Sequence, residues 1–263
     1  MKKVLFFLVA ASLVAFTACD DKENVEDNST TTGGSVYGTW VHDLARESAD
    51  KLVINENGTC TLYSEEFAYT YDSKNDSLHL LDKYSSSEKL NSYKVSFYGD
   101  VMTWSWTEEE IGHVFYDVWY KEGGNFGRKV TDARYDLFTD ASADDTMGVY
   151  IFKGDKVDLY IIAWGTHLSG TFAHENGVLT MNFTAGECLS SESDHLSWFA
   201  PGIDPETLEP YEGYEWYNMQ TLDDHTKYLF GDYKDMFSKV TFVLTGDNNG
   251  YGSVGRSGMI KKH

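Results

Sequence analysis

The chain has 263 residues, 41% of them hydrophobic, which is enough for two ordinary domains with buried cores. Its 42 acidic residues outnumber 21 basic residues, and the formal net charge at pH 7 is −21. Such a surface repels nucleic acid and anionic lipid, and no basic patch offsets it, so no nucleic-acid partner is expected.

Residues 1–18 are predicted to be a signal peptide. Two lysines precede an uncharged run over residues 4–18, which is shorter than the roughly 20 apolar residues of a membrane-spanning helix. The segment FTAC at residues 16–19 resembles the lipobox of bacterial lipoproteins, in which the cysteine is acylated and becomes the mature N-terminus. The resemblance implies that Cys19 carries the lipid. The alternative is a secreted protein with a leftover thiol.

Residues 19–35 are predicted to be a disordered tether, because Val25 is their only large apolar residue. Two or more acyl chains on Cys19, palmitate among them, would hold the protein at a membrane, since each buried CH₂ contributes about 0.8 kcal/mol. The acidic run after Cys19 resembles an export signal that sends some lipoproteins of Gram-negative bacteria to the cell surface. We therefore expect an outer-membrane lipoprotein that faces outward, although a merely solvated tether also explains the charge.

Residues 36–124 are predicted to form the first β module. Apolar and polar residues alternate, and the runs are rich in Val, Ile, Tyr, Phe, Trp and Thr, which is typical of β-hairpins. Helical periodicity is nearly absent, so the fold class is predicted to be all-β. Three turn dipeptides separate the predicted strands: Asn57-Gly58, Asn75-Asp76 and Gly99-Asp100.

The start of this module carries a family resemblance. Gly38-Thr39-Trp40 opens the first predicted strand and resembles the Gly-x-Trp start of lipocalin-like domains, including those common in lipoproteins of Gram-negative gut bacteria. The resemblance covers residues 36–122 and implies an up-and-down barrel for the first module. The second module has no Gly-x-Trp segment.

Residues 128–263 are predicted to form a second β module. Its first two turns follow those of the first module at an offset of about 100 residues, which indicates an internal duplication, with chance likeness among hairpins as the alternative. Each module would bury its apolar face as an antiparallel meander closed into a barrel or sandwich. The turns of the second module are Gly154-Asp155, Asn176-Gly177 and Gly246-Asp247.

Three tryptophans of the first module are candidate ligand contacts. Trp104 and Trp106 lie two residues apart, so they share one face of a strand. Trp119 lies on the next predicted strand. In a barrel wide enough for a ligand these side chains would line an apolar pocket. The alternative is that they fill the core.

The second module carries an insertion, at about residues 185–235, that holds all three prolines of the chain. Proline stiffens a loop and lowers the entropic cost of presenting aromatic side chains to a ligand such as a sugar. The alternative is that the loop packs its own aromatics onto the domain. Asp204 before Pro205 predicts an N-cap and one helical turn. The candidate ligand contacts here are Trp198, Tyr211, Tyr214, Trp216 and Tyr217.

Catalytic and metal-binding motifs are weak. The histidines form no His-x-His or His-Glu-x-x-His pattern, so no metal or cofactor is expected. Cys60 and Cys188 lie one in each module, as a disulfide or as two buried thiols. A glycosidase needs two carboxylates that flank the scissile bond, and the sequence does not supply their separation. Four glutamates of the insertion raise that alternative: Glu206, Glu209, Glu212 and Glu215.

These patterns predict a membrane-anchored, surface-exposed module that is not an enzyme and binds a glycan or a small apolar ligand. The first alternative is a structural component of an envelope complex, docked on a partner protein through the aromatic insertion. A glycoside hydrolase is the third possibility.

Overall fold

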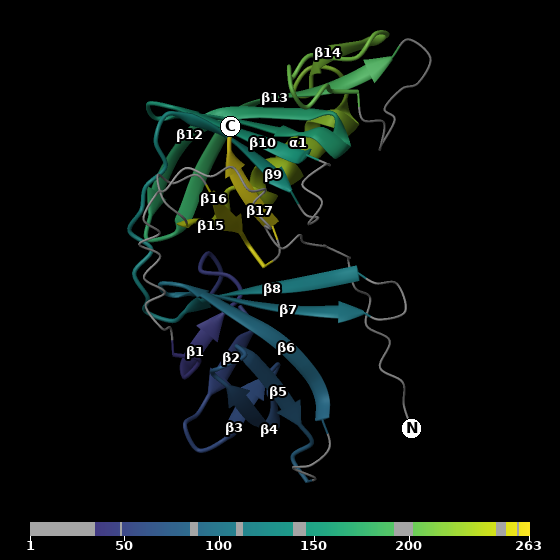
Figure 1. Ribbon diagram of the computed structural model, residues 1–263. Helices are drawn as coiled ribbons and strands as arrows, with labels where there is room; N and C mark the ends of the chain where they lie inside the picture. The colour runs from purple at the N-terminus through teal and green to yellow at the C-terminus, as the bar shows by residue number, and fades with distance from the viewer. Residues whose placement is uncertain are drawn as a thin grey trace, which may run out of the picture.

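The computed structural model of the protein describes residues 35–47, 49–84, 89–108, 113–138, 146–191, 202–245, 251–256 and 258–263. Within these ranges nearly all regular structure is β, and the strands form two closed sheets that lie one above the other in Figure 1. Cys19, Trp198 and the Gly246-Asp247 turn lie outside the described residues.

The first sheet is an eight-stranded antiparallel barrel. Each strand pairs with the next along the chain, and β1 pairs with β8 to close the ring. This is the up-and-down order. The strands are β1 (Gly38–Val41), β2 (Lys51–Ile54), β3 (Thr59–Leu62), β4 (Glu65–Asp72), β5 (Ser77–Leu81), β6 (Lys89–Tyr98), β7 (Val101–Glu108) and β8 (His113–Lys121).

The second sheet is also a closed eight-stranded antiparallel barrel, because β12 pairs with β13 and β17 pairs with β9. The predicted all-β fold with two modules is therefore confirmed. The strands of this ring are β9 (Ala133–Phe138), β10 (Thr146–Lys153), β11 (Lys156–Ile161), β12 (Thr166–Glu175), β13 (Val178–Ser191), β15 (Lys239–Thr245), β16 (Tyr251–Val254) and β17 (Gly258–Lys262).

The hairpin turns that join these strands lie where the sequence predicts them. Gly58 and Gly99 have positive φ in the β2–β3 and β6–β7 turns, a conformation that glycine adopts without steric cost. In the second barrel, Asn176 and Gly177 both have positive φ in the β12–β13 turn, as a type I′ turn requires. The alternation of strand and turn thus follows from local sequence.

The insertion between β13 and β15 holds β14 (Tyr214–Asn218) and a helix, α1 (Asp224–Met236). β14 extends the sheet along the far half of β13. The helix was not predicted, and it begins at Asp223, whose carboxylate accepts a 2.8 Å hydrogen bond from the Thr226 amide. The predicted cap at Asp204 also forms, with a 2.8 Å bond from the Glu206 amide, but a turn follows it rather than a helix.

Helix α1 covers one end of the second barrel. Phe230 is buried with Leu168 and Cys188, which belong to the interior cluster of that barrel. A Cβ atom at Gly186 would collide with the Phe230 ring, so glycine at this position allows the helix to approach β13. Trp164, in the short 3-10 helix η1 (Ile162–Trp164), stacks on Tyr233 of α1 at 5.2 Å between ring centroids.

Both barrels are filled by their own side chains. In the first barrel, Trp104 is 1% exposed and Trp119 is 0% exposed, so these two tryptophans contribute to a packed core. Cys60 and Cys188 are buried free thiols, one in each barrel interior, so the alternative of two thiols is the one observed. The largest buried side chains of the second barrel are Tyr135, Tyr150, Phe152, Phe183 and Phe242.

The two barrels pack directly against each other. Val118 and Tyr120, on the outer face of β8, form a buried cluster with Val243 of β15. The Thr241 hydroxyl donates a 2.7 Å hydrogen bond to the Asp43 carboxylate and accepts one from the Leu44 amide. Figure 1 shows β7 and β8 on the side of the first barrel that faces the second. Within the described part of the chain, no helix is long and apolar enough to cross a membrane.

Candidate functional site

One end of the first barrel carries the exposed side chains of Tyr63, Tyr84 and Leu90. Because consecutive strands alternate in direction, the β1–β2, β3–β4, β5–β6 and β7–β8 connections all lie at this end. We call it the Tyr63 end, after the residue at the tip of the β3–β4 turn. At this end β7 finishes and β8 begins, so Trp106 and Phe115 lie near it.

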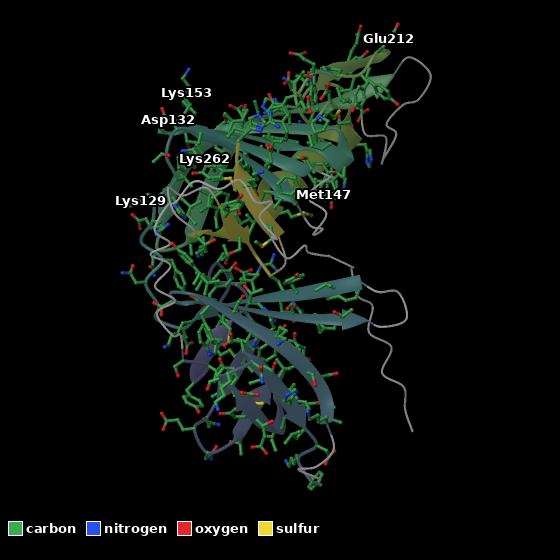
Figure 2. All side chains as sticks on the ribbon, viewed as in Figure 1. Lys129, Asp132, Met147, Lys153, Glu212 and Lys262 are labelled. Atoms are coloured by element: carbon green, nitrogen blue, oxygen red, sulfur yellow. The ribbon has the colours of Figure 1, made fainter. Side chains whose placement is uncertain are left out.

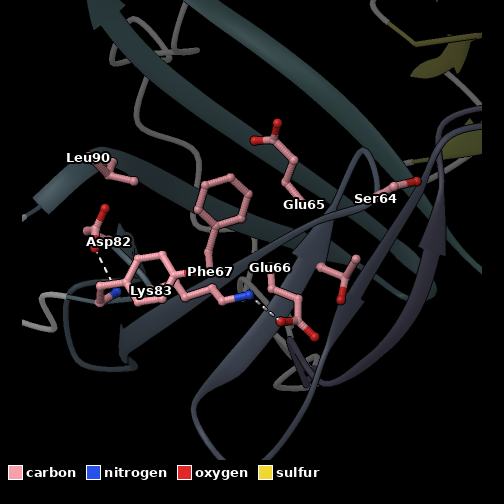
Figure 3. Close-up of a pocket in the computed structure, with 9 residues that line it drawn as sticks. Ser64, Glu65, Glu66, Phe67, Asp82, Lys83 and Leu90 are labelled. Carbon is pink, nitrogen blue, oxygen red and sulfur yellow. Dashed lines mark hydrogen bonds and ion pairs between the residues drawn. The ribbon is translucent and has the colours of Figure 1, made fainter. Parts of the chain in front are cut away.

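A hollow of about 550 Å³ opens at the Tyr63 end (Figure 3). Phe67 lies at its centre and Glu65 beside it, on the same face of β4. Lys83, in the β5–β6 connection, pairs with Glu66 of β4 at 2.9 Å, and its ammonium lies 5.6 Å from the centroid of the Tyr84 ring. The lining residues are Thr61, Ser64, Glu65, Glu66, Phe67, Asp82, Lys83, Tyr84 and Leu90.

The volume and lining of this hollow fit a small polar ligand. Sites for small molecules occupy about 300–1,000 Å³ and combine apolar or aromatic walls with a few polar groups. Tyr84 is 88% exposed and Leu90 is 44% exposed, so apolar surface is offered to solvent here. The carboxylates of Glu65 and Asp82 provide acceptors.

The three predicted tryptophans of the first module do come together inside the barrel. β7 and β8 pair Trp104 with Asp117 and Trp106 with Phe115, and directly opposed residues share one face of a sheet. Trp106 is half-buried and stacks on Phe115 at 5.5 Å between centroids. Trp119 lies deeper, where its ring stacks on His42. Only Trp106 of the three reaches toward solvent.

Two indole groups in this barrel are unusual. Trp104 Nε1 and Trp119 Nε1 are buried and have no hydrogen-bond partner among the residues that the structure describes. A buried donor without an acceptor costs about 1–3 kcal/mol. By contrast, Trp40 Nε1 donates a 2.9 Å bond to the Val36 carbonyl.

The β3–β4 turn that borders the hollow is strained. Tyr63 and Ser64 have φ values of 52° and 68°, in the left-handed region that residues with a Cβ atom rarely adopt. The two-residue link between the paired Leu62 and Glu65 requires this conformation, which costs about 1–3 kcal/mol per residue and persists where the strand pairing and the surrounding contacts hold it. Ser64 lines the hollow and Tyr63 points away from it into a polar network.

The polar network joins four side chains from both barrels. Arg256 donates from Nε and Nη2 to the two carboxylate oxygens of Asp117, at 2.7 and 3.0 Å. The same Nη2 donates to the Tyr63 hydroxyl at 2.7 Å. His42 contacts that hydroxyl through Nε2 at 3.3 Å and the Val118 carbonyl through Nδ1 at 2.9 Å.

Burial determines the charge states in this network. Desolvation lowers the pKa of His42 to about 4, against an opposing effect of Asp117, so the imidazole is neutral at pH 7. Its Nδ1 then carries the hydrogen donated to Val118, and Nε2 accepts from Tyr63. Desolvation, with the charge of Asp117, raises the pKa of Tyr63 to about 12, so the phenol keeps its hydrogen.

The residues of the insertion that were predicted to contact a ligand lie on the second barrel, away from the hollow. Tyr214 and Trp216 are half-buried and pack on its outer face with Leu189 and Ile203, as the self-packing alternative requires. Tyr217 is half-buried against the interior cluster. Tyr211 is 45% exposed. The glutamates Glu206, Glu209, Glu212 and Glu215 are all exposed. Glu212 lies at the extremity of the molecule farthest from the first barrel (Figure 2).

A second histidine cluster lies on that outer face. His167 contacts Asp158 through Nε2 at 2.9 Å and Glu187 through Nδ1 at 3.1 Å. Its ring stacks on Tyr160 at 4.2 Å and meets the edge of Trp216 at 6.1 Å. Burial opposes the charged form, but the hydrogen bonds to the two carboxylates outweigh it and raise the pKa of His167.

Sequence reasoning missed Asp117, Tyr63, His42 and Arg256. Strand alternation could have predicted that Asp117 faces inward, because it lies two residues from both Phe115 and Trp119. No local pattern predicts the contact of Arg256, since its partner Asp117 lies 139 positions away. Among the described residues, no group of three or more His, Cys, Asp and Glu side chains could hold a metal ion.

Comparison of the chain with protein-family models, with curated proteins and with solved structures found no match.

Proposed function

We propose that the protein is a lipid-anchored surface protein that binds a glycan, without catalysis, at the Tyr63 end of its first barrel. The observation that carries this proposal is the hollow of about 550 Å³, which combines exposed aromatic surface with carboxylate, hydroxyl and ammonium groups. Sugars present apolar faces that stack on aromatic rings and hydroxyl groups that donate and accept hydrogen bonds.

The packed interior favours a glycan at this end over an apolar ligand inside the barrel. Trp104, Trp119 and Met102 are at most 1% exposed, so an enclosed ligand would have to displace core side chains. A sugar that rests on Phe67 and Tyr84 needs no such displacement. The lipocalin-like character of the first barrel remains part of the proposal, and its ligand would lie at the rim.

The charge of the hollow narrows the class of glycan. Its lining holds three carboxylates, Glu65, Glu66 and Asp82, against one ammonium, and that ammonium is already paired with Glu66. An acidic sugar would be repelled at this rim. The site therefore suits neutral or amino sugars.

The anchor belongs to the proposal as well. Acylated Cys19 would tether the barrels to the outer membrane, and the acidic residues after it would direct them to the cell surface. Palmitate labelling that is lost in Cys19→Ala, together with protease accessibility on whole cells, tests the anchor and the exposure separately. Labelling that persists in Cys19→Ala would contradict the anchor.

The binding test uses a panel of neutral hexasaccharides built from glucose, xylose or mannose, with amino and acidic oligosaccharides beside them. Replacement of Tyr84 by alanine should weaken binding of a neutral hexasaccharide by up to about tenfold, because stacking on one aromatic ring contributes about 0.5–1.5 kcal/mol. The control is Tyr228→Ala, which removes a tyrosine that is 65% exposed on α1 of the second barrel. Equal affinity in both variants, or no binding by the unmodified chain, would refute the proposal.

The alternative, docking on an envelope partner through the insertion, has support in Tyr211, which is 45% exposed and directly precedes Glu212 in the chain. Co-purification of a defined partner that depends on Tyr211 and persists in Tyr84→Ala would favour it over glycan binding.

A further inference from the structure

The turn between β16 and β17 reaches across to the first barrel. Tyr120 of β8 is fully buried, and its hydroxyl lies 2.7 Å from the Gly255 carbonyl and 2.9 Å from the Ser253 hydroxyl. The Val118 amide donates a 2.9 Å bond to the Arg256 carbonyl. The backbone of residues 253–256 is thereby attached to the outer face and edge of β8.

This attachment uses a gap in the wall of the first barrel. β1 pairs with β8 only at Trp40–Lys121 and Val41–Tyr120, so the pairing stops before Val118. The Arg256 carbonyl supplies the acceptor that a longer β1 would have supplied. Residues of the second barrel thus complete the wall of the first one next to the Tyr63 end.

The Arg256 side chain continues from this fixed backbone to the rim of the barrel. Its guanidinium forms the bidentate pair with Asp117, whose side chain is 13% exposed, and contacts the Tyr63 hydroxyl. A planar fork with two donors on one carboxylate has little freedom to turn. The guanidinium therefore fixes the position of the Tyr63 side chain.

We propose that Arg256 is a positioning residue for the ligand hollow, so that the second barrel forms part of the site on the first. Its hold on Tyr63 maintains the strained turn, and the next residue along that turn, Ser64, lines the hollow. Burial disfavours the charge of Arg256, but its hydrogen bond to Asp117 more than compensates and raises its pKa, so the guanidinium stays charged over the physiological pH range. This inference rests on the proposed function in one respect, namely that the hollow binds the glycan.

The first measurement needs no ligand. Hydrogen–deuterium exchange of the segment 62–67 is compared in the unmodified chain, in Arg256→Met and in Arg46→Ala. Arg46 is the matched control, because it pairs with Asp43 at 3.4 Å in the β1–β2 connection at the same end, with its side chain 71% exposed. Exchange of the segment should become at least about tenfold faster in Arg256→Met and remain unchanged in Arg46→Ala.

A second variant distinguishes a local effect on the turn from a general loss of structure. Asp117→Asn keeps the shape of the side chain and one acceptor, and should raise exchange in the segment 62–67 by a smaller factor than Arg256→Met. Amide hydrogen exchange in strands β5 and β7 should keep its original rate in all three variants. Unchanged exchange of the segment in both Arg256→Met and Asp117→Asn would overturn the inference.

Affinity for the neutral hexasaccharides provides the second measurement. Arg256→Met should weaken binding about tenfold, and Arg256→Lys should fail to restore it, because lysine cannot contact Asp117 and Tyr63 in the same fork geometry. If the unmodified chain binds and Arg256→Met binds equally well, the inference is wrong and the proposed function stands. If exchange rises but the unmodified chain binds no hexasaccharide, the proposed function is wrong and the positioning of the turn stands.

Discussion

The two barrels share one topology but differ in what lies at their ends. In the second barrel, helix α1 places Phe230 against the interior, and the insertion before it lays Tyr214 and Trp216 on the outer wall. In the first barrel, the described parts of the connections at the Tyr63 end contain no helix, and a hollow of about 550 Å³ opens there. Among the described residues, the insertion covers the second barrel, and no comparable segment covers the hollow on the first.

The exposure of aromatic side chains, more than their number, distinguishes the two barrels. Most of the described aromatic residues of the insertion pack on the second barrel, whereas the hollow has two aromatic residues, the half-buried Phe67 and the 88% exposed Tyr84. Binding groups are commonly carried by connections on a rigid scaffold. A high aromatic content in a loop therefore does not by itself indicate a ligand site, because the side chains can be packed on the domain.

The largest effect should come from uncovering the second barrel. Phe230→Ala removes the main contact of α1 with the interior, and loss of a buried phenylalanine costs about 3–5 kcal/mol of unfolding free energy. Urea unfolding followed by tryptophan fluorescence measures the change. Tyr228→Ala, on the exposed face of the same helix, should alter the free energy by less than about 0.5 kcal/mol. Equal stability of the two variants would mean that the helix does not close this barrel.

The second effect is a pH dependence of the unfolding free energy that arises from His42 in the first barrel. The pKa of His42 is about 4 in the folded protein and about 6.5 in the unfolded chain, so the unfolded chain takes up the proton first as the pH falls. Titration of His42 therefore leaves the unfolding free energy unchanged above pH 6.5 and lowers it, by about 3 kcal/mol in all, as the pH falls toward 4. His42→Gln lacks this titration, so its unfolding free energy should fall less steeply over the same window. Parallel pH profiles would contradict the buried, neutral state of His42.

The smallest effect has the opposite sign and belongs to the second barrel. The pKa of His167 is raised, so its contribution to stability is fully present below the unfolded pKa of about 6.5 and is lost as the pH rises through the folded pKa. Asp158 and Glu187 are 39% and 45% exposed, so solvent screening limits the contribution to below about 1 kcal/mol. Comparison of His167→Gln with the unmodified chain from pH 5 to pH 8 checks this. A difference that grows with increasing pH would disprove it.

Local patterns predicted much of this molecule. Alternation predicted the strands, and glycine and asparagine in short turns predicted the hairpins, because both signals depend on residues within a few positions. The same alternation predicted that Trp104 and Trp106 share a face, and the structure places both inside the barrel with Trp119. Extending that alternation to Asp117 would have revealed one more residue of the network.

Other features had no local signal. The pattern of α1 is weakly amphipathic, and its cap pairs Asp223 with a threonine rather than with the glutamate or glutamine of the usual capping box, so the helix was missed. The two-residue link between the paired Leu62 and Glu65 places Tyr63 and Ser64 at positive φ, although neither is a residue type that predicts this conformation, and the contact of Tyr63 with Arg256 joins residues 193 positions apart.

Side-chain periodicity and turn chemistry over short distances specify the all-β class, the two modules and most of the hairpins. Long-range contacts specify that both rings close, that the insertion covers the second barrel, and that Arg256 meets Asp117 at the rim of the first. These contacts join residues far apart in the chain, and their free energy comes from burial and charge pairing that exist only after the barrels have packed together.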